Sequence, residues 1–368
     1  MLLLMRLRIW SPIMLLVAAP YAFVVACGQE GAAPPTVGSA AVGVHNGGGF
    51  DASLVDSTVV GPGSGLVTLA TGVVSPRAIA LGPSTVYWTT AQVASTGALV
   101  GDASSGTGGI ESVPREGGAR TEVIDGLTSP RELALFDTTL FFVEGNTGVG
   151  TVDAYDLGST AFSRIAAGQS PPLPMAVDEG ILYWTGSNGS SLDVFSASSS
   201  TDHVSMLASL GADAGDLSPV AMTSIGTTLY LLAKGTDGAS ILQVASSGGT
   251  PKSIWHDASL TPSDLASAGT SLYWIASGSA FGGQVLGMGA SGGAVVTLAS
   301  NLDNPAKLAV DGDEVYFTTS VAGGSVLAVS TGGGGVRTLA SGLDYPFALA
   351  VDDAVYFTTT STVGRVAR

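Results

Sequence analysis

The stretch that decides the fold is Pro305–Thr319, with the sequence PAKLAVDGDEVYFTT. It consists of a proline, a short apolar segment, a polar turn and a second apolar segment that contains an aromatic pair. Two short segments rich in β-branched and aromatic residues, separated by a turn, are typical of paired β-strands. We therefore expect an antiparallel hairpin at this position.

The same pattern occurs seven times along the chain. The copies begin at Pro76, Pro130, Pro172, Pro219, Pro262, Pro305 and Pro346, at intervals of 54, 42, 47, 43, 43 and 41 residues. A period near 40–50 residues with several strands per repeat is the sequence signature of a β-propeller. The sequence predicts an all-β fold, a seven-bladed β-propeller with four-stranded antiparallel blades.

Two positions after each proline carry most of the packing information. The third residue after the proline is large and apolar in every copy, as in Ile79 and Leu308, and we expect it to pack between neighbouring blades. The fourth is Ala in six of the seven copies, which suits the crowding near a central axis. In the second strand Tyr takes the middle place in six copies, and this aromatic stripe is interpreted as core.

The two ends of the repeat array predict how the ring closes. The last copy is followed only by 361–368, which leaves room for a third strand and no fourth. Residues 65–72, GLVTLATG, match the outer strand of the preceding repeat, 335–342, GVRTLASG. We therefore expect the N-terminal strand to complete the last blade and to remove an exposed sheet edge. Only Gly or Asn stands at the end of four outer strands, at Gly126, Gly168, Asn301 and Gly342, which predicts a left-handed turn there.

Residues 1–26 have the features of an export signal. Arg6 and Arg8 precede an apolar run that ends in small residues before Cys27, the single cysteine of the chain. Val24–Cys27 resembles the bacterial lipobox, which implies that Cys27 is lipidated and that the protein is anchored in the cell envelope. Gly28 after the cysteine resembles outer-membrane lipoproteins. A spanning helix, or an ordinary signal with an incidental cysteine, is the alternative. Residues 27–62 are rich in Gly, Ala and Pro and are predicted to be a flexible tether, and 63–368 the propeller.

The second strands carry a family resemblance. Val86–Thr90 (VYWTT), Leu182–Gly186 (LYWTG) and Leu272–Ala276 (LYWIA) resemble the YWTD class of propellers and the related NHL-type and SMP-30-like repeats. The resemblance covers about residues 65–368. No copy keeps the Asp of YWTD, and that class usually has six blades. Propellers host many functions, so the resemblance implies the fold and not an activity.

Composition excludes some functional classes. The formal net charge is −16, whereas a nucleic-acid binder requires a basic face. With three His and one Cys, no metal-ligand spacing is present, and no metal or other cofactor is predicted. Acids such as Asp311 and Asp352 lie at hairpin turns, where we expect them to cap their own backbone. SMP-30-like lactonases hold a central divalent metal with acids and Asn, but the inner strands here offer mostly Ala, Leu and Val.

Candidate binding residues lie where the copies differ. The entrances to the inner strands carry Arg77, Arg131, Glu132, Asp264 and Lys307, and Glu144 and His256 are expected on the same side. The insertions at 91–108 and 211–217 also lengthen loops on this face, and loops on a rigid scaffold often carry binding sites. The hypothesis is a small-ligand or protein-binding site at the channel mouth. The alternative is that these residues are a solvated rim.

These observations lead to one main functional hypothesis and two alternatives. The main hypothesis is a non-enzymatic envelope lipoprotein, expected to be a monomer, that uses a propeller face to bind a small molecule or a protein. One alternative is a propeller enzyme of the lactonase-like, metal-dependent hydrolase type. The other is a structural envelope protein without a ligand.

Overall fold

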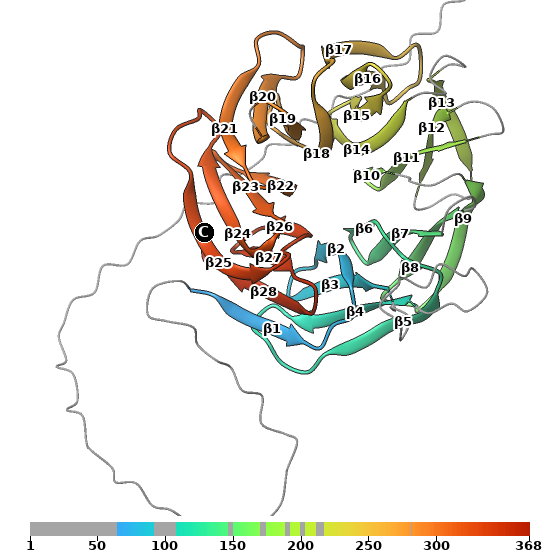
Figure 1. Cartoon of the computed structure of the whole chain (residues 1–368). Coiled ribbons are helices and arrows are strands. Elements are labelled where there is room, and N and C mark those ends of the chain that lie inside the picture. The colour runs from blue at the N-terminus through green and yellow to red at the C-terminus, as the bar shows by residue number, and fades with distance from the viewer. Residues whose placement is uncertain are drawn as a thin grey trace, which may run out of the picture. The chain divides into compact units, whose positions relative to one another are not determined.

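The computed structural model describes residues 65–91, 108–145, 150–169, 174–187, 192–198, 203–210, 217–280 and 282–368. Within these ranges the regular structure is β-strand, arranged as seven four-stranded antiparallel sheets in a ring (Figure 1). The predicted seven-bladed propeller is confirmed. The predicted signal segment, Cys27 and the tether lie outside the described residues, as do nearly all residues of the two predicted insertions. None of the described residues form a helix that is long and apolar enough to cross a membrane.

Each blade runs from an inner strand to an outer strand in chain order. Blade 1 contains β2 (Pro76–Leu81), β3 (Thr85–Thr90), β4 (Gly108–Pro114) and β5 (Thr121–Leu127). Blade 2 contains β6 (Leu133–Phe136), β7 (Thr139–Gly145), β8 (Gly150–Asp156) and β9 (Phe162–Gln169). Blade 3 contains β10 (Met175–Asp178), β11 (Ile181–Ser187), β12 (Leu192–Ser198) and β13 (Val204–Ser209).

The second half of the ring repeats this order. Blade 4 contains β14 (Ser218–Ile225), β15 (Thr228–Gly235), β16 (Gly238–Ala245) and β17 (Lys252–Asp257). Blade 5 contains β18 (Thr261–Ala268), β19 (Ser271–Gly278), β20 (Gly282–Gly289) and β21 (Val296–Leu302). Blade 6 contains β22 (Pro305–Asp311), β23 (Glu314–Thr319), β24 (Ala322–Ser330) and β25 (Arg337–Asp344). Blade 7 contains β26 (Leu349–Val351), β27 (Val355–Thr358), β28 (Thr362–Val366) and, from the other end of the chain, β1 (Val67–Thr71).

The core lies between the blades, as the repeat predicts. Ile79, three residues after its proline, packs in a cluster that contains Tyr356 of blade 7. Ala80, the next residue, packs in the cluster shared with Phe142 of blade 2. Successive side chains of a strand point to opposite faces, so each inner strand contacts the preceding blade with one residue and the following blade with the next.

The register adds a second reason for the recurrent alanine. Ala309 lies directly opposite Tyr316 in the β22–β23 ladder, and Ala80 lies directly opposite Tyr87 in the β2–β3 ladder. Residues that are directly paired across an antiparallel ladder share one face of the sheet. A small residue opposite the tyrosine leaves space for the ring between two blades.

The ring is closed by β1, which pairs with β28 in an antiparallel ladder from Val67↔Arg365 to Thr71↔Thr362. Leu69 and Ala70 of β1 are 6% and 8% exposed and belong to the core cluster that joins blades 7 and 1. The predicted closure by the N-terminal strand is therefore confirmed. The left-handed backbone predicted at the Gly and Asn positions is confirmed, since φ is 56° at Asn301 and 73° at Gly342. The predicted place is wrong, because both residues lie within the outer strands β21 and β25, where the ladder shifts register, and not in a turn that ends the strand.

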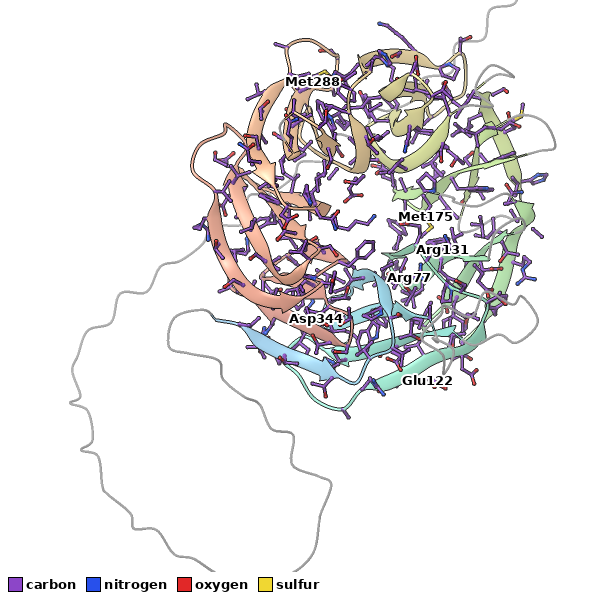
Figure 2. All side chains as sticks on the ribbon, viewed as in Figure 1. Arg77, Glu122, Arg131, Met175, Met288 and Asp344 are labelled. Carbon is purple, nitrogen blue, oxygen red and sulfur yellow. The ribbon has the colours of Figure 1, made fainter. Side chains whose placement is uncertain are left out.

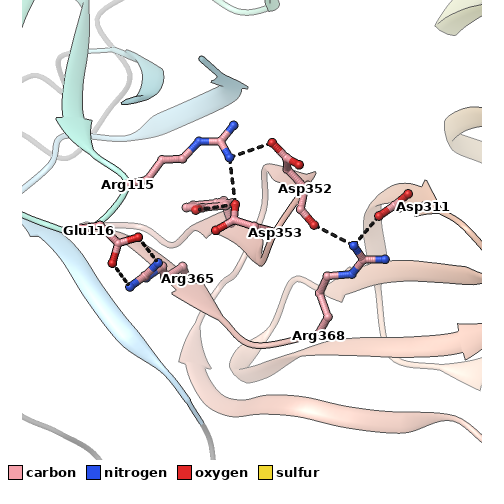
Figure 3. A network of polar contacts seen from close by, with 8 residues as sticks. Arg115, Glu116, Asp311, Asp352, Asp353, Arg365 and Arg368 are labelled. Atoms are coloured by element: carbon pink, nitrogen blue, oxygen red, sulfur yellow. Dashed lines mark hydrogen bonds and ion pairs between the residues drawn. The ribbon is translucent and has the colours of Figure 1, made fainter. Parts of the chain in front are cut away.

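Ion pairs join blade 1 to blade 7 next to this closure (Figure 3). Arg115, in the turn after β4, contacts Asp352 and Asp353 in the β26–β27 turn, at 2.7 and 2.8 Å. Glu116 forms a bidentate pair with Arg365 of β28, at 3.1 and 2.8 Å. In the same turn, the Asp352 carbonyl accepts a hydrogen bond from Arg368.

These pairs refine the prediction for the turn acids. Instead of capping their own backbone, Asp352 and Asp353 bind a guanidinium from another blade, and Asp311 pairs with Arg368. The cause is the ring itself, because closure brings the basic turn after β4 next to the acidic turn of blade 7.

Candidate functional site

Five of the seven predicted site residues line one cavity at the entrances of the inner strands. The cavity has a volume of about 330 Å³. Its charged lining residues come from blades 1, 2, 5 and 6: Arg77, Arg131, Glu132, Asp264 and Lys307. Figure 2 shows Arg77 and Arg131 near one another at the inner edge of the ring. The shared head of the repeat brings these residues together, because each lies one or two positions after its blade's proline.

The floor of the cavity is aliphatic. It is made by the third residue after the proline in five blades: Ile79, Leu133, Leu265, Leu308 and Leu349. These are the residues that also pack between blades, and the first four are at most 9% exposed. Charged groups therefore surround an apolar base, which is the usual composition of a small-ligand site.

Lys307 and Asp264 form the best-defined pair in the cavity. Lys307 Nζ lies 3.2 Å from Asp264 Oδ1, and the Leu308 backbone amide donates to Asp264 Oδ2 at 2.9 Å. The Asp264 carboxylate raises the pKa of Lys307, and Glu132 adds to this effect. The ammonium is therefore charged, and Asp264 is held in place by two donors.

Arg77 and Arg131 differ from this pair. Within the described residues, neither guanidinium forms an ion pair or a hydrogen bond, and the Arg131 Nε is buried without a partner. Burial, and secondarily the neighbouring charge of Arg131, lowers the pKa of Arg77. An arginine nevertheless stays charged in proteins, so two like charges face one cavity.

Glu144 lies at the end of β7, next to the cavity-lining Val143 but outside the lining itself. Its side chain is 9% exposed and accepts a hydrogen bond from the Thr128 amide, with Arg164 at 3.5 Å. Burial, together with the nearby Asp153 carboxylate, raises the pKa of Glu144 to about 7. Glu144 is thus a buried carboxyl within blade 2.

His256 is also separate from the cavity. It lies on β17, the outermost strand of blade 4, where Nδ1 is 3.1 Å from the Ser240 hydroxyl and Nε2 is 3.9 Å from Asp237. Ser, His and Asp are thereby neighbours, but the His256 and Asp237 side chains are 42% and 75% exposed. The arrangement lacks the buried, tightly bonded acid that orients a catalytic histidine.

The nine other residues that line the cavity are all apolar, and none of them was among the predicted site residues. Phe347 and Leu349 of blade 7 line the cavity, and they occupy the first and third positions after Pro346. A signal for them existed, because the same positions supplied Arg77 and Ile79 in blade 1. A search restricted to polar side chains could not select them.

The cavity presents oxyanion-binding groups. The two guanidinium groups, which have no partner among the described residues, and the Lys307 ammonium can donate hydrogen bonds to carboxylate or phosphate oxygens. In the described part of the chain, no group of three or more His, Cys, Asp or Glu residues is placed to hold a metal ion.

Comparisons with known proteins identify the fold. No family model matches the chain, and no curated protein matches its sequence. Among solved structures, oligogalacturonate lyase from Vibrio parahaemolyticus superposes with a TM-score of 0.59 at 8% identity, over 82% of this chain and 93% of that one. The β-propeller domain of the Trilobed protease from Pyrococcus furiosus has a TM-score of 0.56 at 11% identity, over 80% and 94% of the two chains.

A computationally designed protein, Ika8, is similar to the same degree. Its TM-score is 0.54 at 12% identity, over 82% of this chain and 98% of that one. The Trilobed protease domain is described as having an open velcro topology, whereas here β1 closes blade 7 by pairing with β28. At these identities the likeness concerns the architecture alone: this chain has the β-propeller fold.

Proposed function

We propose that this protein is an exported, lipid-anchored binding protein that uses the mouth of the propeller channel as its ligand site. The observation that carries the proposal is the convergence of five charged side chains from four blades on one cavity with an aliphatic floor. Residues from four blades meet there although they are far apart in sequence. A solvated rim would leave such residues exposed, but Asp264 is 8% exposed and the Lys307 side chain is 25% exposed.

The binding function is tested by a survey of ligands on the purified full chain. A panel of organic acids, amines, neutral sugars and short peptides is added, and thermal unfolding is measured. A ligand that binds only the folded state stabilises it by RT ln(1 + [L]/Kd), so the melting temperature rises with the ligand concentration. At least one compound is expected to stabilise the wild type.

A cavity-filling variant makes the survey specific. Ala78 lines the cavity, whereas Ala119 is an exposed alanine in the β4–β5 turn of blade 1 that does not. Ala78→Trp should abolish the stabilisation, and Ala119→Trp should preserve it. If no compound distinguishes the two variants, the channel mouth is not a ligand site.

The anchor is proposed from the sequence of residues 24–27 and is tested separately. A single acylated residue with two or more lipid chains anchors a protein stably without a spanning helix. Cys27→Ala should therefore move the protein from the membrane fraction to the soluble fraction of fractionated cells. Retention of the variant in the membrane fraction would exclude lipidation at Cys27 as the anchor.

A further inference from the structure

The basic residues of the described chain divide into three groups. Seven of them form ion pairs with acids: Arg115, Arg120, Arg164, Lys307, Arg337, Arg365 and Arg368. Lys234 and Lys252 are exposed, where water solvates the ammonium. Arg77 and Arg131 form the third group, because both are half-buried and neither has an acidic partner in the described ranges.

This third group is energetically unfavourable in the free protein. Burying part of a charged group without a partner costs free energy, and two cations at one cavity repel one another. The chain has a net charge of −16, so this shortage of acidic partners is local to the cavity. Charged groups with perturbed pKa values that converge on a cavity are typical of functional sites.

The acids of the cavity do not relieve this repulsion. Asp264 is already bound by Lys307 Nζ and by the Leu308 amide, which uses one acceptor site on each oxygen. Glu132 acts electrostatically on Lys307, and no hydrogen bond or ion pair joins its carboxylate to the guanidinium of Arg77 or Arg131. Among the described residues, no acid therefore pairs with Arg77 or Arg131, and their charge is available to a ligand.

We propose that the ligand is a small organic anion whose oxyanion binds between Arg77 and Arg131, while its apolar part lies on the aliphatic floor. This proposal rests on the channel mouth being the binding site. A guanidinium donates parallel hydrogen bonds to a carboxylate or a phosphate, so either group satisfies the chemistry. A cavity of about 330 Å³ is at the lower end of ligand-site volumes, which limits the ligand to a small molecule.

Four probes with one hexyl-sized chain test the charge requirement. Hexanoate and hexyl phosphate carry the two candidate oxyanions, hexanamide is the neutral counterpart, and hexylamine is the cation. Binding to the full chain is measured by isothermal titration calorimetry at low and high salt. We expect at least one anion to bind about tenfold or more tightly than hexanamide, and hexylamine not to bind. High salt should lower the affinity for the anion. Whichever of hexanoate and hexyl phosphate binds more tightly shows whether the ligand belongs to the carboxylate or the phosphate class.

Substitutions then locate the anion. Arg77→Gln and Arg131→Gln should each lower the affinity for the anion about tenfold or more. The control Arg120→Gln, which changes an exposed arginine of blade 1, should leave this affinity unchanged. Because Arg77→Gln also removes the repulsion, its melting temperature should equal or exceed that of the wild type. The melting temperature therefore distinguishes loss of binding from loss of folding. A rise in stability when a binding residue is replaced is typical of sites where function costs stability.

The outcomes distinguish this inference from the proposed function. If hexanamide binds as tightly as the anions, if neither anion binds, or if both glutamine variants keep full affinity, the anion site is refuted. A neutral compound from the wider survey that Ala78→Trp excludes would then still support a ligand site at the channel mouth. Failure of every compound in that survey would refute both.

Discussion

Replacing Leu69 with alanine tests whether β1 holds the ring closed. Leu69 is 6% exposed and packs with Trp88 and Tyr356 in the cluster that joins blades 7 and 1. Removing its isobutyl group loses the transfer free energy of the buried carbons and leaves a cavity. The expected loss in the free energy of unfolding is about 3 kcal/mol, within the range of about 2–5 kcal/mol for buried Leu→Ala changes.

The chain contains a matched control. Val67–Ala70 of β1 and Val296–Ala299 of β21 have the same sequence, VTLA, and Leu298 is 3% exposed. Leu298→Ala should therefore cost a similar amount in equilibrium denaturation. The two variants differ in position. β1 pairs with β28 from the far end of the chain, whereas β21 is the outer strand of blade 5, which is built from four consecutive strands.

Native-state hydrogen exchange distinguishes the two variants. If β1 detaches as a local opening, Leu69→Ala should accelerate exchange of the β28 amides that pair with Val67–Thr71 by about 100-fold, since about 1.4 kcal/mol corresponds to a factor of ten. Leu298→Ala should leave those amides unchanged. Equal protection of β28 in both variants would refute the view that β1 is the separable closure of the ring.

Three further predictions follow from buried charges. The folded pKa of Glu144 is raised from 4.5 to about 7, so the free energy of unfolding should fall by up to about 3 kcal/mol as pH rises between these values. Glu144→Gln should make the free energy of unfolding, measured by urea denaturation, less dependent on pH in this range, and an unchanged pH dependence would contradict the assignment. Arg115→Met should lower the free energy of unfolding by about 1–2 kcal/mol because it removes two contacts to blade 7 and a cation–π contact with Tyr356. The exposed control Arg120→Met should lower it by less than about 0.5 kcal/mol, and equal losses would show that the Arg115 contacts to blade 7 contribute nothing to stability. Asp264→Asn should lower the free energy of unfolding by about 2 kcal/mol because it leaves the mostly buried Lys307 ammonium unpaired. Adding Lys307→Met should recover most of that stability in chemical denaturation, and a double variant no more stable than the single one would exclude charge imbalance as the cause.

The fold was accessible from the sequence because the repeat encodes it locally. Each copy places an apolar residue three positions after its proline and an aromatic residue in the next strand, and each strand alternates its faces. The similarity of residues 65–72 to an outer strand was enough to predict pairing with a partner nearly 300 residues away. These sequence patterns predict the structure because equivalent positions pack in the same way in every blade.

The site was accessible only in part. Position relative to the proline brought Arg77, Arg131, Glu132, Asp264 and Lys307 to one cavity, because these positions are equivalent in every blade. His256 failed to join them because sequence indicates which face a strand end lies on but not its distance from the axis. The pairing of Lys307 with Asp264, and the lack of partners for the two arginines, depend on side-chain geometry between blades, which no repeat pattern contains.

The pairing of β1 with β28 also has a consequence for how the chain reaches its native state. Among the strands of the ring, β1 is synthesised before the others and its partner β28 after them, with nearly 300 residues between Val67 and Arg365. The blades between them are built from neighbouring strands and can assemble as they emerge, whereas closure must wait until β28 has been synthesised. Until then β1 and the outer edge of β28 are unpaired strands that can associate with other chains. A chain cut short before Thr362 would keep that exposed strand permanently, so closure of the ring requires that β28 has been synthesised.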